Sequence, residues 1–232
     1  MLSQKEINNM EEDIRQIYMD KDYETCITKC KVLITKLRNK EVTGSYNLWF
    51  VYNMIGRTYI YYNIENHNNL AIYYIKKALQ YSLKSFTNAP IISEIAYIQT
   101  IWLLAREYES INKNKDAINC YEICENYYDE LINKGIDEDE IFFQLAEVLN
   151  NKGKILQDKN IINKALYIYK SKSCEDFKKI DEAYNNLLEI MIKENCNLIE
   201  IQQIINKIKN IQIKQKWTQE VFNKSAKTRT LI

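Results

Sequence analysis

Residues that bend or break helices are almost absent from this chain of 232 residues, which has only four glycines and one proline. Sheets and tight hairpins depend on such residues at their turns, so a fold of many short strands is excluded. Pro90 is the one position where a missing backbone N–H disfavours a helix interior. The sequence therefore predicts an all-α protein made of long helices.

Helical periodicity runs through most of the chain. Ser3 and Glu6 form a capping-box pattern, which predicts the start of the first helix. Apolar residues then recur at helical spacing in roughly ten segments. Gly135 predicts a left-handed helix end, and the acidic pair Asp137 and Glu140 predicts that the next helix begins at Asp137.

These segments group into about five helix pairs, and no connection is long enough to mark a domain boundary. We therefore expect a single repeat domain over residues 1–232. Its end is expected to hold a helix over residues 198–215, followed by a C-terminal capping segment over residues 216–232. Residues 63–69, which include His67, are expected to form a loop.

The helix pairs share one pattern of small and aromatic residues. Small residues let two antiparallel helices approach closely, and aromatic residues fill the space between pairs. The third pair fits the pattern with Ile101, Leu104, Ala105, Tyr108, Ala117, Tyr121 and Cys124. The second pair fits with Tyr52, Ile55, Gly56, Tyr59, Ala71, Ile75 and Ala78. The fourth pair has Leu149, Gly153, Ala165 and Tyr169 in place, but it departs at Lys152 and Lys172, and Leu156 replaces the usual tyrosine. The first pair is degenerate and the fifth has no clear register.

This pattern resembles the tetratricopeptide repeat, and it implies antiparallel helix pairs stacked in a right-handed superhelix. The equivalent residues Cys26, Ala71, Ala117 and Ala165 are 45, 46 and 48 residues apart, which exceeds the usual step of about 34. The long step is similar to that of the C-terminal repeat domain of RRNPP-type bacterial peptide-pheromone receptors. Residues 1–37 match a repeat hairpin and lack the N-terminal helix-turn-helix of those receptors.

The resemblance implies that one face of each first helix lines a concave groove for a short peptide. On that face a basic residue recurs one turn after a polar or aromatic one, so both share one side of the helix. The couples are Glu11 with Arg15, Asn53 with Arg57, Trp102 with Arg106, and Asn150 with Lys154. Arginine offers a planar fork for carboxylates, and asparagine can both donate and accept.

We accordingly predict a peptide-binding site that consists of Arg15, Asn53, Arg57, Tyr61, Trp102, Arg106, Asn150 and Lys154, with Tyr18 beside it. The alternative is a solvated helix face on which basic residues are common.

Other residues argue against catalysis and against metal binding. The pairs Cys26/Cys30 and Cys120/Cys124 have the spacing of half a zinc site, but they coincide with packing positions where cysteine acts as a small apolar residue. A single histidine gives little support to histidine-based acid–base chemistry, and no phosphate-binding or dinucleotide-binding motif occurs. We expect no enzymatic activity, no cofactor, no metal and no disulfide.

The charge balance bears on the partners of the chain. With 32 basic and 31 acidic residues the net charge is +1, so we expect no nucleic-acid partner. The sequence also predicts no signal peptide and no membrane span, and hence a cytoplasmic location. The expected partner is a short peptide, sensed as a quorum-type signal, or a partner protein. The alternative function is a scaffold that grips a folded protein, and a homodimer is left open.

Overall fold

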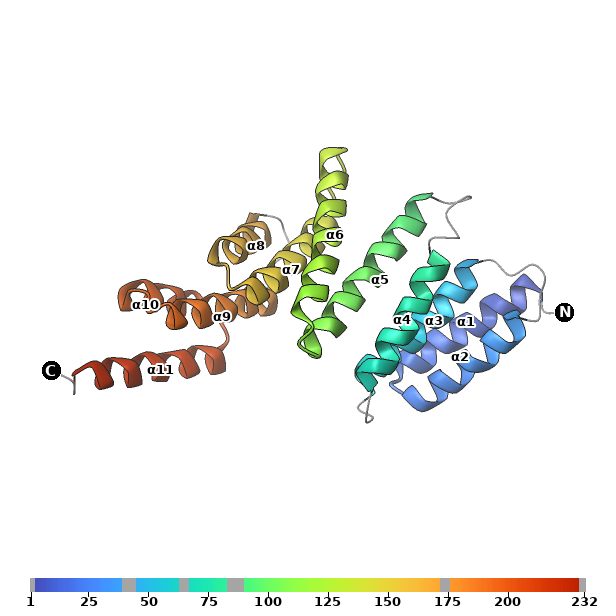
Figure 1. The fold of residues 1–232 in the computed structure, drawn as a ribbon, viewed down its shortest axis with the longest axis horizontal. Coiled ribbons are helices and arrows are strands. Elements are labelled where there is room, and N and C mark those ends of the chain that lie inside the picture. Colours follow the sequence, from blue (N-terminus) through green and yellow to red (C-terminus); the bar gives the residue numbers. More distant parts are fainter. Residues whose placement is uncertain (1–2, 39–44, 63–66, 83–89, 172–175, 230–232) are drawn as a thin grey trace. The chain divides into compact units, whose positions relative to one another are not determined.

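The computed structural model describes residues 3–38, 45–62, 67–82, 90–171 and 176–229, and every regular element within them is an α-helix (Figure 1). This confirms the all-α fold class. The chain divides into two compact units, residues 1–123 (unit 1) and residues 124–232 (unit 2), with the boundary inside α6. The single domain expected over residues 1–232 stays a prediction.

Within its described residues, unit 1 holds five helices and the first half of a sixth. They are α1 (Gln4–Met19), α2 (Tyr23–Arg38), α3 (Ser45–Tyr61), α4 (His67–Ser82), α5 (Pro90–Ser110) and the start of α6 (Asn114–Asn133). Unit 2 continues with the rest of α6, α7 (Asp139–Leu156), α8 (Lys159–Ser171), α9 (Phe177–Lys193), α10 (Leu198–Lys207) and α11 (Ile211–Arg229). None of the helices in the described ranges is long and apolar enough to cross a bilayer.

The first helices of four pairs end in the same kind of tight turn. One residue in each turn adopts a left-handed backbone conformation, with φ between 55° and 61°; these residues are Lys21, Asn112, Gln157 and Asn195. In the first turn the amide of Lys21 bonds to the carbonyl of Tyr18, and the amide of Asp22 bonds to that of Ile17. Such a turn uses up free carbonyl groups at the helix end and reverses the chain, so the second helix packs antiparallel to the first.

The predicted helix signals at two other ends are also confirmed. Ser3 and Glu6 form a capping box at the start of α1, with each side chain bonded to the backbone amide of the other. Gly135 follows α6 with φ of 83°, as its position predicted.

The small-residue positions lie where paired helices touch. Ala71, Ala105, Ala117 and Ala165 have no exposed surface. A Cβ atom added at Gly56 would lie 2.7 Å from Cγ1 of Ile75 on α4, and one added at Gly153 would lie 2.8 Å from Cγ1 of Ile162 on α8. The two glycines therefore allow the close approach of α3 to α4 and of α7 to α8, as the repeat pattern predicted.

The cysteines of the repeat pattern are part of the same core. Cys26, Cys30 and Cys124 have no exposed surface and Cys120 is 8% exposed, so they occupy packing positions. Cys196 is half-buried, and Cys174 lies outside the described residues.

Two predicted helix starts are wrong by a few residues. His67 does not lie in a loop but is the first residue of α4, because a first turn needs no apolar residue and therefore escapes a search for periodicity. The helix expected to begin at Asp137 begins at Asp139, and its N-terminal capping position is Glu138, whose side chain makes no capping bond. Asp139 and Glu140 lie in the first turn instead, where the helix dipole favours acidic side chains.

The predicted helix over residues 198–215 is also wrong, because the chain breaks after Lys207. The buried carboxylate of Asp181 on α9 accepts hydrogen bonds from the backbone amides of Lys209 (3.0 Å) and Asn210 (2.7 Å). The side-chain oxygen of Asn210 then accepts from the amides of Gln212 and Ile213 and caps α11. The C-terminal capping helix therefore begins at Ile211, five residues before the predicted residue 216.

Candidate functional site

A cavity of about 490 Å³ lies between the first helices α1 and α3 of unit 1. Its wall combines basic, amide, aromatic and thioether side chains. The lining residues are Glu12, Arg15, Gln16, Tyr18, Met19, Tyr46, Trp49, Phe50, Asn53, Met54 and Arg57. Three of the eight predicted site residues, Arg15, Asn53 and Arg57, thus meet in one hollow.

The two guanidinium groups of the cavity have different surroundings. Arg57 is half-buried, and its Nε donates a hydrogen bond to Oδ1 of Asn53 at 2.8 Å. Among the described residues Arg57 has no acidic partner, so its terminal nitrogens are available to an anion. Arg15 lies 3.1 Å from a carboxylate oxygen of Glu12, and its guanidinium carbon is 4.6 Å from the ring centroid of Phe50.

The amide of Asn53 is occupied by the protein itself. Asn53 is 4% exposed, and its Nδ2 donates to Oγ1 of Thr100 on α5 at 3.0 Å. The indole N–H of Trp49 donates to the same oxygen at 3.0 Å, while the Thr100 hydroxyl donates to the carbonyl of Ala96. Asn53 was predicted to hold a peptide backbone, but it instead ties α3 to α5 and fixes the position of Arg57.

A second buried polar contact joins α1 to α3 behind the cavity. Glu11 is 4% exposed, and its Oε1 accepts a hydrogen bond from Nδ2 of Asn47 at 2.8 Å. Burial raises the pKa of the Glu11 carboxyl, although the bond from Asn47 and the charge of Arg15 act in the opposite direction. Its other oxygen, Oε2, lies 4.0 Å from Nη2 of Arg15, so the ionised carboxylate offsets part of the Arg15 charge.

Two tyrosines extend the cavity wall toward solvent. Tyr18 lines the cavity, and burial is the main cause that raises its pKa to about 12. The ring of Tyr61 meets that of Tyr18 edge-on, with centroids 6.4 Å apart, and the Tyr61 side chain is 53% exposed. Tyr61 is thus next to the cavity and accessible.

The predicted residues of α5 form a separate couple. Arg106 is exposed, and its guanidinium carbon lies 5.0 Å from the ring centroid of Trp102. The indole Nε1 of Trp102 is buried and has no hydrogen-bond partner among the described residues. Neither residue lines the cavity between α1 and α3.

The remaining predicted residues belong to unit 2. Asn150 is 2% exposed, and its Oδ1 accepts a hydrogen bond from Nδ2 of Asn186 on α9 at 3.1 Å. As with Asn53, the predicted role in holding a peptide backbone does not fit an amide that links two helices in the core. Lys154 is exposed in the last turn of α7, where a positive charge complements the helix dipole.

The sequence pattern missed the apolar wall of the cavity. Trp49 and Phe50 precede Asn53 by four and three residues, so they lie on the same helical face as the couple Asn53 and Arg57. One further turn along that face would have identified them. No metal site is indicated either, because nowhere in the described ranges do three or more histidine, cysteine or acidic side chains gather for one.

Comparison with known proteins gives information on the fold only. No family model matches the sequence. No curated protein matches it either. Among solved structures, BtubC (BKLC) from P. vanneervenii has a TM-score of 0.63 at 12% identity, over 97% of this chain and 82% of that chain.

Two further solved structures are similar. A putative kinesin light chain of Podosopora anserina with nearly identical TPR-like repeats has a TM-score of 0.63 at 11% identity, over 93% of this chain and 99% of that chain. PlcR of Bacillus thuringiensis, in complex with the peptide PapR7 and DNA, has a TM-score of 0.51 at 15% identity, over 100% of this chain and 76% of that chain. The helix pairs, the buried small residues and these similarities together establish a tetratricopeptide-like helical-repeat fold.

Proposed function

We propose that this chain is a peptide-binding repeat protein, a cytoplasmic sensor of a short signalling peptide, and that the peptide lies on the first helices of unit 1. The observation that carries the proposal is the cavity between α1 and α3, in which the half-buried Arg57 has no acidic partner among the described residues. Binding sites typically combine an apolar wall with a few polar groups that orient the ligand.

The chemistry of the cavity favours an acidic side chain or a free carboxyl terminus next to an apolar residue. Arg57 is held by Asn53, so its fork is already oriented for a carboxylate. Phe50, Trp49 and Met54 provide the apolar surface for the neighbouring side chain. The fold similarity to PlcR, a structure that contains a bound peptide, supports a peptide as the ligand.

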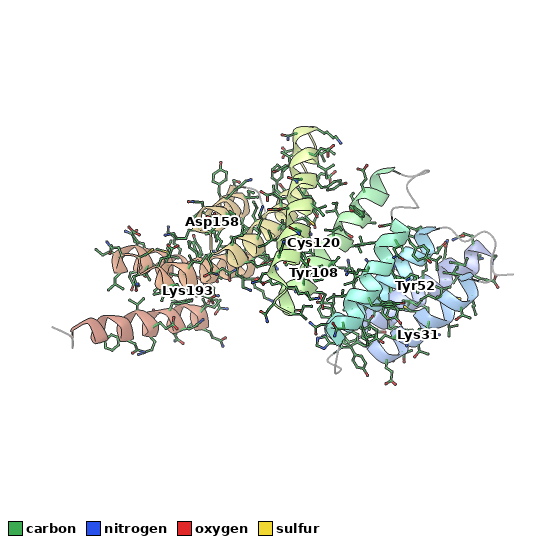
Figure 2. All side chains as sticks on the ribbon, in the orientation of Figure 1. Lys31, Tyr52, Tyr108, Cys120, Asp158 and Lys193 are labelled. Carbon is green, nitrogen blue, oxygen red and sulfur yellow. The ribbon has the colours of Figure 1, made fainter. Side chains whose placement is uncertain are left out.

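The test is a selection followed by titration. Short peptides with free carboxyl termini are selected on the wild-type protein, and the best binders are titrated by calorimetry against wild type and Arg57→Ala. We expect Arg57→Ala to weaken binding by roughly 5- to 150-fold, or about 1–3 kcal/mol, because an oriented charge pair is lost from a half-buried site. Lys31→Ala is the control. Lys31 lies on α2, the second helix of the first pair (Figure 2), and it is not one of the residues that line the cavity. Equal affinity of wild type and Arg57→Ala for every selected peptide would remove this proposal.

A scaffold that binds a folded protein is the second candidate, and one observation favours it. Large apolar side chains are exposed on the last two helices, with exposed fractions of 67% for Ile199, 69% for Ile211 and 65% for Phe222. Light scattering over a concentration series gives the mass of the wild type and of Phe222→Glu. A dimer of the wild type that Phe222→Glu dissociates would support a protein-binding role for α11.

A further inference from the structure

Unit 2 contains two adjoining cavities that the peptide proposal does not use. One has a volume of about 370 Å³ and lies against α8, α9 and α10, and the other has a volume of about 210 Å³. Both are lined by Lys170, Tyr184 and Lys207, so they adjoin, and we call the two together the lysine pocket. Its size lies within the range of small-molecule sites, about 300–1,000 Å³.

Three lysines from separate segments meet at the lysine pocket. Lys170 lies in the last turn of α8, Lys207 in the last turn of α10, and Lys209 just beyond α10. The ammonium group of Lys170 donates to the hydroxyl of Tyr184. Lys209 places its Nζ 3.0 Å from the ring centroid of Phe177, and the Lys207 side chain has no polar partner in the described part of the chain.

Helix dipoles alone do not account for this arrangement. A basic residue in the last turn of a helix interacts favourably with the helix dipole, which explains why Lys170 and Lys207 are tolerated at their positions. The dipole does not explain why the side chains of Lys170, Lys207 and Lys209 all line the same pocket.

One carboxylate also lines the pocket, and its oxygens are already in use. Asp181 is 4% exposed and accepts the backbone amides of Lys209 and Asn210, one on each oxygen. Three ammonium groups and one carboxylate leave an excess of two positive charges among the described lining residues. A ligand with two negative charges neutralises that excess, whereas a single carboxylate does not.

The rest of the lysine pocket is lined by apolar and aromatic side chains, which could contact an apolar or aromatic group attached to the anion. Leu166, Ile204 and Ile180 supply apolar surface, and the ring of Tyr167, which is 72% exposed, offers a face for an aromatic group. The hydroxyl of Tyr184 accepts from Lys170, so its own proton is directed to another acceptor.

We infer that the lysine pocket binds a small phosphate monoester with an aromatic or apolar body. The dianionic phosphate lies among Lys170, Lys207 and Lys209 and accepts a hydrogen bond that the Tyr184 hydroxyl donates. Lysine is a common phosphate ligand because its ammonium group acts as a compact point charge. This binding site is separate from the peptide cavity and lies in the other unit, so each proposal stands without the other.

The test uses phenyl phosphate as the probe, titrated by calorimetry at low salt against the full-length protein. We expect binding to the wild type, and affinity at least about ten-fold weaker in Lys207→Gln, because one of the charge partners is removed. Lys178→Gln is the matched control, since Lys178 is an exposed lysine of α9 outside the pocket and its loss changes the net charge equally. Lys209→Gln is the second variant, in case Lys207→Gln lowers the melting temperature.

Five outcomes decide whether the proposal holds. Weaker binding of phenyl sulfate, a monoanion of the same shape, supports the charge argument, and weaker binding of inorganic phosphate supports the role of the apolar wall. An equal loss of affinity in Lys178→Gln would overturn the proposal, as would no binding to the wild type at millimolar probe. Tighter binding of a phosphotyrosine peptide than of phenyl phosphate would overturn the assignment to a small molecule.

Discussion

Asn186 donates a hydrogen bond from its side-chain nitrogen to the side-chain oxygen of Asn150, 3.1 Å away, and so joins α9 to α7 in the core of unit 2. The two residues are 6% and 2% exposed. Replacement of Asn150 by leucine leaves the amide of Asn186 buried without this acceptor. We expect Asn150→Leu to lower the free energy of unfolding by about 1–3 kcal/mol, measured by chemical denaturation.

The double variant Asn150→Leu/Asn186→Leu distinguishes this cause from a change in shape. Because both polar groups are then gone, its stability should return close to that of the wild type. The single variant Asn186→Leu completes the comparison. If the double variant is destabilised by the sum of the losses in Asn150→Leu and Asn186→Leu, the hydrogen bond between the two side chains does not account for the effect.

The close approach of α7 to α8 depends on Gly153. A Cβ atom there would lie 2.8 Å from Cγ1 of Ile162, 3.1 Å from its backbone nitrogen and 3.2 Å from Cβ of Ile161. We expect Gly153→Ala to destabilise the protein by about 1–3 kcal/mol, because this overpacking outweighs the better helix propensity of alanine. Gly56→Ala should cost less, since the atoms beyond Cγ1 of Ile75 are 3.3 and 3.5 Å away there, rather than 3.1 and 3.2 Å. A Gly153→Ala variant as stable as the wild type in urea would contradict this account.

The repeat pattern predicted the packing because small residues are needed wherever two helices touch. Gly56, Gly153 and Ala117 could be recognised for that reason. The break between α10 and α11 could not, since it depends on the carboxylate of Asp181, which is 28 residues away from Lys209 in the sequence. Helix periodicity is a local signal and does not report a long-range hydrogen bond that ends a helix.

In the candidate site, too, the local sequence pattern predicted some features, and long-range contacts determine the others. Arg15 and Arg57 could be placed together because equivalent positions of neighbouring first helices lie side by side. The burial of Asn53 could not be predicted, because its partner Thr100 comes from α5, 47 residues further along the chain, and has no part in the repeat pattern. Whether a polar residue of a repeat contacts a ligand or a neighbouring helix depends on such partners.

Glu11 gives the stability of the protein a dependence on pH. Burial raises the pKa of its carboxyl in the folded protein above the ordinary value of 4.5. Protonation of Glu11 therefore stabilises the folded protein. This contribution to the free energy of unfolding is fully present below pH 4.5 and is lost as the pH rises through the pKa that Glu11 has in the folded protein. Glu11→Gln keeps an acceptor for Asn47 without a buried charge, so we expect it to melt at a higher temperature than the wild type at pH 7.

The difference in melting temperature should shrink as the pH is lowered toward 4.5, because a growing fraction of the wild-type Glu11 carboxyl is then protonated. Glu12→Gln is the control, because Glu12 also pairs with Arg15 but its side chain is 74% exposed. If Glu11→Gln melts below the wild type at pH 7, the attraction between Glu11 and Arg15, 4.0 Å apart, outweighs the cost of burial.

The three tryptophans differ in one respect that a matched series of substitutions can test. The indole N–H of Trp49 donates to Thr100 and that of Trp217 donates to Asn185, each at 3.0 Å, whereas the buried N–H of Trp102 has no acceptor among the described residues. All three lose apolar area when replaced by phenylalanine, but only Trp49→Phe and Trp217→Phe also lose a hydrogen bond, which costs about 0.5–1.5 kcal/mol. Trp102→Phe instead removes an unpaired buried donor, so we expect it to be the least destabilising of the three in chemical denaturation. A loss of stability in Trp102→Phe as large as in Trp49→Phe would mean that the indole N–H of Trp102 has a partner in solution.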